Sequence, residues 1–490
     1  VHRPRRAAQL TASAPVAISV APSRRERFRS FAQGRSERFL PARRRAMGGQ
    51  TARAHWQNGE IEAAEWRERE YHQRMESTSL IPRLVFPRIQ EALTDTRIVV
   101  IQGARQVGKS TLAGQVLAGS PVVSVTLDDP ASLGFARSDP AGFVEQAPNA
   151  TLLIDELQRA PELVVALKAA VDRDKRPGRF LVTGSANLLE LSSTHESLAG
   201  RAERIELYPL SQRELASGSG SFIDVAFAPS SLASHSSALN RDDYFARVVD
   251  GGYPEALQRR SSRRRENWYQ AYVSQIVRRD APDISGLQRI ADLPRLLRLI
   301  AGRMGSTMVW SSLAADAGIP RRTLDPYIVL LETLYLTHAL PAWSVNLTSR
   351  EVKQPKVFPV DSGLAANLLG VAPDGLGPGA PLSGPMLECF VVGELRRQLT
   401  WARQRAALYH FRDSRGVEVD AVLEAPDGRV VGIEVKATAT VRTKDAAGLS
   451  ILRDRLGDRF VAGYVLHTGR SSVAVGDRIM AIPMDSLWAV

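Results

Sequence analysis

One eight-residue stretch constrains the fold of this chain more than any other: Gly103-Ala-Arg-Gln-Val-Gly-Lys-Ser110. Two glycines lie five positions apart and are followed at once by a lysine and a serine. The apolar run 97–101 (RIVVI) precedes this stretch, and the run 111–118 (TLAGQVLA) follows it. The first run is typical of a fully buried strand, and the second of a helix. The order strand, loop, helix is the one that a phosphate-binding loop (P-loop) requires.

The chemistry of this loop suits a nucleoside triphosphate. Its glycines allow backbone turns that a Cβ would obstruct, so successive N–H groups can point at a phosphate at a helix N-terminus. Lys109 is expected to reach the β- and γ-phosphates, and the Ser110 hydroxyl is expected to bind Mg²⁺. The predicted cofactors are therefore ATP and Mg²⁺. The predicted nucleotide-binding residues are Gly103, Ala104, Arg105, Gln106, Val107, Gly108, Lys109, Ser110 and Thr111.

A second motif follows the next buried runs of the chain. Residues 151–154 read TLLI and are followed at once by Asp155 and Glu156. An acidic strand end is weak evidence alone, because solvated strand ends are often acidic, but it becomes strong downstream of a P-loop. Asp155 is expected to hold Mg²⁺ through water or Ser110. Glu156 is the predicted catalytic base, which orients and deprotonates the attacking water.

Length and composition limit the class of protein. A chain of 490 residues is too long for one hydrophobic core, so two or three domains are expected. Hydrophobic residues at 44% and charged residues at 24% are typical of a soluble globular protein. One cysteine, Cys389, excludes an internal disulfide framework and a cysteine-rich zinc site. No apolar run approaches the roughly 18 residues that span a bilayer. We therefore expect a cytoplasmic protein without a membrane partner.

The basic charge is concentrated at the beginning of the chain. The net charge is +12, and residues 1–74 contribute +9 of it through 16 Arg, no Lys and 7 Glu. This segment is rich in Arg, Ala and Ser and lacks apolar periodicity, so it is expected to be a disordered basic leader. Three interpretations compete: an arm that contacts nucleic acid, a transit-type segment, or residues that are not translated in the native protein. We favour the third, because Met75 opens an ordinary beginning for a P-loop domain.

The rest of the chain divides by pattern. Residues 79–215 alternate buried strands with helices, which predicts a parallel sheet covered on both faces. Residues 216–240 are rich in Ser, Ala and Gly and are expected to form a flexible insertion. Residues 241–345 are predicted to be helical and to include a winged helix, and residues 346–490 form a last α/β domain.

The winged helix is expected within residues 287–345. Gly318-Ile319-Pro320 makes the turn before a second helix at 321–335, and Arg321 and Arg322 lie where such a helix contacts DNA. Pro326 inside that helix and the lack of a dense basic surface weigh against DNA binding. Winged helices also serve as packing modules, so DNA and a purely structural role remain open.

The last domain carries a second group of candidate residues. A helix over 388–399 is expected to precede a meander of strands over 407–412, 417–423 and 430–435. The motifs Glu418-Val-Asp420 and Glu434-Val-Lys436 lie on that meander, and alternation puts Glu434 and Lys436 on one face. The pattern resembles the PD-(D/E)XK nuclease core. Solvated strand edges can produce the same pattern, so the fold is expected with or without nuclease activity.

Each of these polar residues has an expected role in a nuclease. Asp420 and Glu434 would bind Mg²⁺, and Glu394 or Glu388 on the preceding helix would complete the ligand set. Lys436 would position the attacking hydroxide or stabilise the phosphorane.

Several spaced stretches resemble one family. TGSANLL at 183–189, ESLAGRAERIELYPLS at 196–211 and GGYPEAL at 251–257 resemble prokaryotic AAA+ ATPases that carry a C-terminal DUF4143 domain. The resemblance covers roughly Ser79 to the end. It implies a P-loop NTPase of the AAA+/ASCE group, with the additional strand of the AAA+/STAND proteins, followed by a nuclease-like module within DUF4143.

The resemblance also implies a γ-phosphate sensor and an arginine. The sensor 1 group of AAA+ ATPases lies at the end of a strand between the P-loop and acidic strands, where Thr183, Ser185 and Asn187 are candidates. Asn187 is equally expected as a helix N-cap. Arg201 or Arg204 would stabilise transition-state charge, although a surface role is equally plausible for either.

Two functions follow from these expectations. The first is a Mg²⁺-dependent AAA+ ATPase that couples nucleotide state to a C-terminal nucleic-acid-binding module with nuclease character. The alternative is a STAND-like switch whose nuclease-like fold is inactive and binds a protein or DNA partner. Oligomers of the chain with itself are compatible with both.

Overall fold

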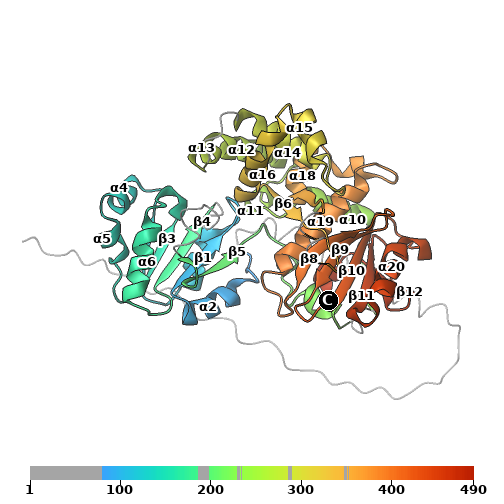
Figure 1. The fold of residues 1–490 in the computed structure, drawn as a ribbon, viewed down its shortest axis with the longest axis horizontal. Coiled ribbons are helices and arrows are strands. Elements are labelled where there is room, and N and C mark those ends of the chain that lie inside the picture. Colours follow the sequence, from blue (N-terminus) through green and yellow to red (C-terminus); the bar gives the residue numbers. More distant parts are fainter. Residues whose placement is uncertain are drawn as a thin grey trace, which may run out of the picture. The chain divides into compact units, whose positions relative to one another are not determined.

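The computed structural model describes residues 80–185, 198–228, 232, 234–284, 290–346, 350 and 353–490 (Figure 1). The expectations for the leader 1–74, for Met75 and for Asn187 fall outside these residues. Within the described ranges, no helix has the length and apolar character that crossing a membrane requires.

The first sheet has five strands, all parallel, as predicted, in the order β2-β3-β4-β1-β5. The strands are β1 (Ile98–Gln102), β2 (Val122–Thr126), β3 (Thr151–Asp155), β4 (Phe180–Gly184) and β5 (Ala202–Glu206). β4 lies between β1 and β3, so the P-loop, the acidic pair and the end of β4 meet at one edge. The strands are not all fully buried, because β2 is an edge strand and alternates between exposed and half-buried residues.

Helices cover both faces of this sheet. The helices are α2 (Phe86–Asp95), α3 (Lys109–Val116), α4 (Pro130–Ser138), α5 (Pro140–Val144), the 3-10 turn η1 (Leu157–Arg159) and α6 (Leu163–Arg173). Val99 and Ile101 of β1 pack in one apolar cluster with Leu112 of α3. Ile98 and Val100 point to the other face and pack in the cluster that includes α6. Alternate residues of one strand therefore serve two cores.

A mostly helical region follows. Its elements are α10 (Arg241–Asp250), α11 (Pro254–Leu257), α12 (Ser262–Gln275), the π-helix η4 (Ile276–Asp280), α13 (Ala281–Ile284), η5 (Ile290–Asp292), α14 (Leu293–Ala301), α15 (Trp310–Ala317), α16 (Arg321–Thr333), β6 (Thr337–Leu340) and β7 (Lys356–Pro359). α14, α15 and α16 precede an antiparallel pair, β6 and β7. Pro326 lies inside α16 without ending the helix.

The prediction of a flexible insertion at 216–240 is wrong for the part around α9 (Phe222–Ala226). Phe222 and Ile223 are fully buried. The Phe222 N–H donates to Gln398 Oε1 at 2.7 Å, and the Tyr464 hydroxyl donates to the Ala226 carbonyl at 3.0 Å. A few large apolar side chains within a Ser-rich segment are sufficient to dock it, because burying each contributes about 1.5–3 kcal/mol.

The last sheet has six strands in the order β12-β13-β11-β10-β9-β8. A short helix, α8 (Gln212–Leu215), follows the first sheet. After β7, the elements of the last part of the chain are α18 (Ser362–Leu369), η6 (Pro373–Leu376), α19 (Ser383–Gln398), β8 (Ala407–Arg412), β9 (Glu418–Glu424), β10 (Val430–Lys436), η7 (Thr443–Ala446), α20 (Ala447–Leu456), η8 (Gly457–Arg459), β11 (Phe460–His467), β12 (Val473–Gly476), β13 (Ile479–Pro483) and α21 (Ser486–Ala489). The predicted meander is confirmed: β8, β9 and β10 pair antiparallel. α20 then crosses over to β11, which is parallel to β10.

Candidate functional site

The two glycines of the P-loop serve different purposes. A Cβ on Gly103 would lie 2.0 Å from the Leu207 carbonyl oxygen, so only glycine fits against that backbone. Gly108 has a φ of 92° and is the N-cap of α3, where the chain turns through the left-handed region. The loop is thus held close to Leu207 and directed into the N-terminus of α3, where its N–H groups can face an anion.

Lys109 is folded back onto the loop. Its ammonium donates to the carbonyl oxygens of Gly103 at 3.0 Å and Ala104 at 2.8 Å. The side chain is buried, and burial lowers the pKa of Lys109 to about 8, with the Arg105 charge acting in the same direction. A phosphate would supply the negative charge that this buried ammonium lacks, so the site is electrostatically prepared for an anion.

Ser110 and Asp155 lie together, as a shared magnesium site requires. The Ser110 hydroxyl donates to Asp155 Oδ1 at 2.7 Å. Thr183 at the end of β4 donates to the same carboxylate and accepts from the Glu156 N–H at 3.2 Å. A hydroxyl and a carboxylate are the hard oxygen ligands that Mg²⁺ prefers, so these residues fit the ion. Thr183 therefore positions the acidic strand end.

Glu156 has a backbone φ of 62° and turns its side chain toward the end of β4. The Ser185 hydroxyl donates to Glu156 Oε2 at 3.3 Å. Gln158 also donates to Glu156, and its amide donates to the Ser185 hydroxyl at 2.7 Å. Among the described sensor candidates, Ser185 thus contacts the predicted base, whereas Thr183 contacts Asp155. Sequence reasoning missed Gln158, whose only signal was its place two residues after Glu156.

Of the two roles considered for Arg201, the one beside the nucleotide does not fit its position within this chain, and the surface role does. Arg201 precedes β5, and the first residue of β5, Ala202, pairs with Ile98 at the start of β1. It therefore lies at the amino ends of the strands, whereas the P-loop follows their carboxyl ends. Its guanidinium instead donates to both oxygens of Asp172, at 2.6 and 3.0 Å.

Arg105 of the P-loop reaches the helical region. Its guanidinium donates to the carboxylate of Asp280, the last residue of the π-helix η4. Burial raises the pKa of Asp280, and Arg105 opposes that shift. Arg105, Asp280, Gln158 and Ser185 line one cleft of about 460 Å³. This ion pair was not expected from sequence, because its members lie in different domains.

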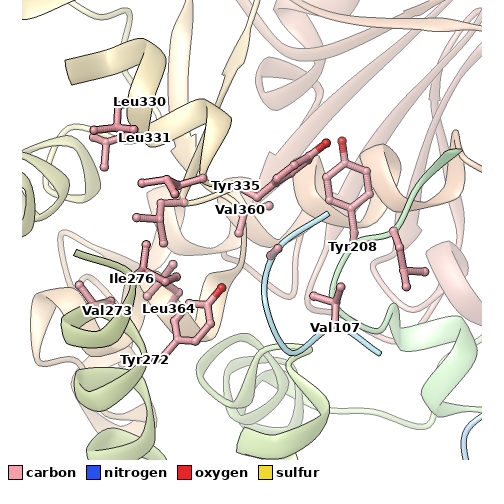
Figure 2. Close-up of a cluster of buried hydrophobic side chains, with 14 of the residues drawn as sticks. Val107, Tyr208, Tyr272, Val273, Ile276, Leu330, Leu331, Tyr335, Val360 and Leu364 are labelled. Atoms are coloured by element: carbon pink, nitrogen blue, oxygen red, sulfur yellow. The ribbon is translucent and has the colours of Figure 1, made fainter. Parts of the chain in front are cut away.

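A second link joins the same two parts of the chain. The Gln102 amide, at the end of β1, donates to the Tyr335 hydroxyl at 2.7 Å. Tyr335 has a φ of 54° and follows α16. Its ring lies edge-on to Tyr208, with centroids 6.4 Å apart. Both rings belong to an apolar cluster that also holds Val107 of the P-loop and Ile276 of η4 (Figure 2).

The predicted nuclease residues of β9 and β10 lie close together. The Val435 N–H donates to Asp420 Oδ2 at 2.9 Å, and the Asp420 N–H donates to Glu434 Oε2 at 3.4 Å. Lys436 donates to Glu434 Oε1 at 2.9 Å. Burial raises the pKa of Glu434, and the nearby Asp420 charge raises it further.

Glu394 does not join this group, contrary to the prediction. It is buried, accepts from the Gln212 N–H at 3.0 Å and pairs with Arg397 at 3.2 Å. The acid of α19 that faces the group is Glu388, the other residue considered. Burial raises the pKa of Glu388, and Asp420 is the second cause.

Three family models match this chain. One is an AAA domain over residues 95–216, one is a domain of unknown function, DUF8612, over 241–375, and one is a domain of unknown function, DUF4143, over 383–487. The chain therefore contains an AAA domain and a C-terminal DUF4143 domain. The AAA domain is an ATP-binding P-loop domain, and its fold is α/β with a parallel sheet.

Two relatives that match most of this chain occur in mycobacteria. Uncharacterized proteins of Mycobacterium bovis and Mycobacterium tuberculosis are each 27% identical over 401 residues, which span 82% of this chain and 83% of the relative. Among solved structures, a Walker-type ATPase of Pyrococcus abyssi has a TM-score of 0.38 at 14% identity, over 60% of this chain and 99% of that one. A STAND protein of Pyrococcus horikoshii with a tetratricopeptide repeat sensor has a TM-score of 0.23 at 12% identity, over 66% and 46%. Likenesses at this level do not bear on function.

The acid cluster of the DUF4143 domain, Glu388, Glu418, Asp420 and Glu434, contains a lysine from the DUF8612 segment. Lys356 of β7 is fully buried, and its ammonium lies 2.6 Å from Glu388 Oε1, 2.6 Å from Glu418 Oε1 and 3.6 Å from Asp420 Oδ1. Sequence reasoning missed it. With Lys356 in place, no group of three His, Cys, Asp or Glu residues in the part of the chain that the structure describes could hold a metal ion.

Proposed function

We propose that this chain is a Mg²⁺-dependent ATPase whose nucleotide state controls the helical region that follows the AAA domain. The observation that carries the proposal is the grouping of Lys109, Ser110, Asp155 and Glu156 at one edge of the sheet. Lys109 is buried, and among the described residues it has no anionic partner at hydrogen-bonding distance. This is the set of groups that phosphoryl transfer to water requires.

Each residue has a separate task in this mechanism. Lys109 leaves the loop carbonyls and binds the β- and γ-phosphates, while Ser110 and Asp155 hold the magnesium ion. A magnesium ion held there would neutralise charge on the phosphates. Glu156 orients the attacking water and accepts its proton at a carboxylate oxygen. Ser185 and Gln158 fix the Glu156 side chain through the hydrogen bonds described above.

Replacing Glu156 by glutamine tests hydrolysis apart from binding. We expect ATP affinity to stay within a few-fold of the unchanged protein, whereas turnover falls about 10²–10⁴-fold, because the base is lost and the shape is kept. Phosphate release and nucleotide titration measure the two effects. Glu91→Gln, an exposed residue of α2, is the matched control. Unchanged turnover in Glu156→Gln would refute the assigned base.

The Arg105–Asp280 pair supports the coupling. A γ-phosphate beside the loop would compete with Asp280 for the Arg105 guanidinium, since arginine binds phosphate and carboxylate alike. Nucleotide bound at the loop would then weaken the Arg105–Asp280 ion pair, which fixes the end of η4. η4 lies in the same apolar cluster as Val107 of the loop. The Gln102–Tyr335 hydrogen bond gives a second route to the end of α16.

Asp280→Asn should weaken the coupling between the P-loop and the helical region. In the unchanged protein we expect ATP to alter amide hydrogen exchange in α12 and η4, and in Asp280→Asn we expect this ATP-dependent change to fall by half or more. Asp325→Asn, on the exposed face of α16, should leave it intact. An unaltered response in Asp280→Asn would show that the ion pair carries no signal.

Besides ATP, nucleic acid is a candidate ligand of this chain, and the exposed start of α16 favours it. Arg321 and Arg322 are exposed in its first turn, where a second helix of this type contacts DNA. Replacing both by alanine should reduce duplex affinity about tenfold and lower the salt slope by about 2. Arg415→Ala with Arg442→Ala removes the same charge from exposed sites of the DUF4143 domain and should have a smaller effect. Equal effects in both pairs would assign binding to net charge alone.

Cleavage of nucleic acid has weaker support. The positions of Asp420, Glu434 and Lys436 favour a nuclease-like site, but Lys356 lies among the acids that would hold its metal. We therefore propose that the DUF4143 domain contributes binding and not cutting. A protein partner, self-association and a cytoplasmic location stay predictions.

A further inference from the structure

We propose that the Lys356 ammonium takes the place of a divalent cation in the acid cluster of the DUF4143 domain, so that this domain holds no catalytic metal. The inference goes beyond the proposed ATPase, because it concerns a site that ATP hydrolysis does not use. A nuclease of the predicted type needs Mg²⁺ on its acids. Here the residues present do not fit the ion.

The geometry is that of an ammonium whose charge is neutralised by carboxylates. Lys356 has three N–H donors, and three carboxylates surround it: Glu388 from α19 and Glu418 and Asp420 from β9. The Lys356 ammonium donates a charge-assisted hydrogen bond to Glu388 Oε1 at 2.6 Å, and it forms an ion pair with Glu418 Oε1 at the same distance. Mg²⁺ would need these same oxygens at about 2.0–2.1 Å and could reach them only by displacing the ammonium.

Three further oxygens of the cluster accept hydrogen bonds from within the protein. Asp420 Oδ2 accepts from the Val435 N–H, and the two Glu434 oxygens accept from Lys436 and from the Asp420 N–H. Two ammonium groups, those of Lys356 and Lys436, therefore face four carboxylates. A dication entering here would meet two like charges at close range.

The backbone of Lys356 holds the ammonium in place. Lys356 pairs with Leu340 across β6 and β7, and a bridge to Thr307 holds its other side. The next two residues, Val357 and Phe358, are fully buried. His410 lies nearby, and burial, together with the Lys356 charge, lowers the pKa of His410 to about 4. The backbone of Lys356 is therefore fixed on both sides, and the ammonium can leave the carboxylates only by rotation of a fully buried side chain.

Titration of the full chain with Mn²⁺ in the absence of nucleotide tests the inference. We expect the unchanged protein and Asp420→Asn to bind Mn²⁺ equally, since Asp420 holds no metal. Lys356→Met should gain one Mn²⁺ site, and adding Asp420→Asn to it should remove that site. Lys353→Met, at an exposed lysine three positions earlier, should gain none. Any manganese bound at the P-loop is common to all forms.

Three results would overturn the inference. The first is a Mn²⁺ site in the unchanged protein that Asp420→Asn removes, a comparison that stands even if Lys356→Met does not fold. The second is Mn²⁺-dependent DNA cleavage by the unchanged protein that Glu434→Gln abolishes. The third is a folded Lys356→Met that gains no site. None depends on ATP hydrolysis, so failure here is distinct from failure of the proposed ATPase.

Discussion

Replacing Lys109 by alanine should abolish ATP binding at concentrations that saturate the unchanged protein. The buried ammonium is the group that the loop offers to the β- and γ-phosphates, and the described contacts give it only loop carbonyls as hydrogen-bond partners. Two charge-assisted hydrogen bonds contribute about 1.5–3 kcal/mol each, so affinity should fall about 10²–10⁴-fold. Calorimetric titration with MgATP measures the loss.

The fold of Lys109→Ala should survive the change. The alanine removes a buried charge whose pKa is already lowered by burial, so loss of the ammonium relieves a desolvation cost. The melting temperature without nucleotide should stay close to that of the unchanged protein, while the increase that ATP produces should disappear. Lys175→Ala, an exposed site after α6, should keep the ATP-dependent increase. Nucleotide affinity that persists in Lys109→Ala would contradict the site.

Replacing Lys356 by methionine should destabilise the chain by about 3–5 kcal/mol. Removing one partner of a buried ion pair leaves the other charge uncompensated, and Glu388 is almost fully buried beside Lys356. Denaturant unfolding measures the loss. Lys353→Met makes the same substitution at an exposed site and should stay within about 0.5 kcal/mol of the unchanged chain.

This deficit should depend on pH in a defined direction. The pKa of Glu388 in the folded protein is raised above its ordinary value by burial, and loss of the ammonium raises it further. The folded state then binds more protons than the unfolded state, so stability falls as pH rises. Because the pKa of Glu388 is raised to about 8 with the lysine in place, the two proteins diverge above that pH, and the deficit of Lys356→Met should be smaller at pH 7 than at pH 9. Adding Glu388→Gln to Lys356→Met should restore part of the lost stability. If Glu388→Gln changed the stability by the same amount with and without Lys356, the two residues would not be paired.

Local sequence was sufficient for the AAA core. The P-loop needs residues that are adjacent in the chain, and β1, β3 and the helix after the loop follow from apolar runs of definite length. The strands of the meander were likewise predicted within one or two residues, because alternation of side chains is a property of each strand alone.

Composition gave a wrong prediction where a few apolar residues decide whether a segment packs against the core. The segment 216–240 has the Ser-rich content of a linker, yet Phe222 and Ile223 dock it in the core of the last domain. For Arg201, a role at the nucleotide and a surface role were equally plausible from sequence, because the register of the following strand was not known. Pairing of Ala202 with Ile98 puts it at the other edge of the sheet.

The sequence alone therefore determined the nucleotide-binding loop, its acidic partner, strands β1 to β4 of the first sheet and the meander β8 to β10, because each depends on neighbours in the chain. Only tertiary structure decided which acid of α19 faces β9: Glu388 and Glu394 lie about 120° apart around the helix axis, and docking selects one face. Only tertiary structure brought Lys356 into the acid cluster. That contact joins residues from separate domains, and no local periodicity encodes the close approach of two folded surfaces.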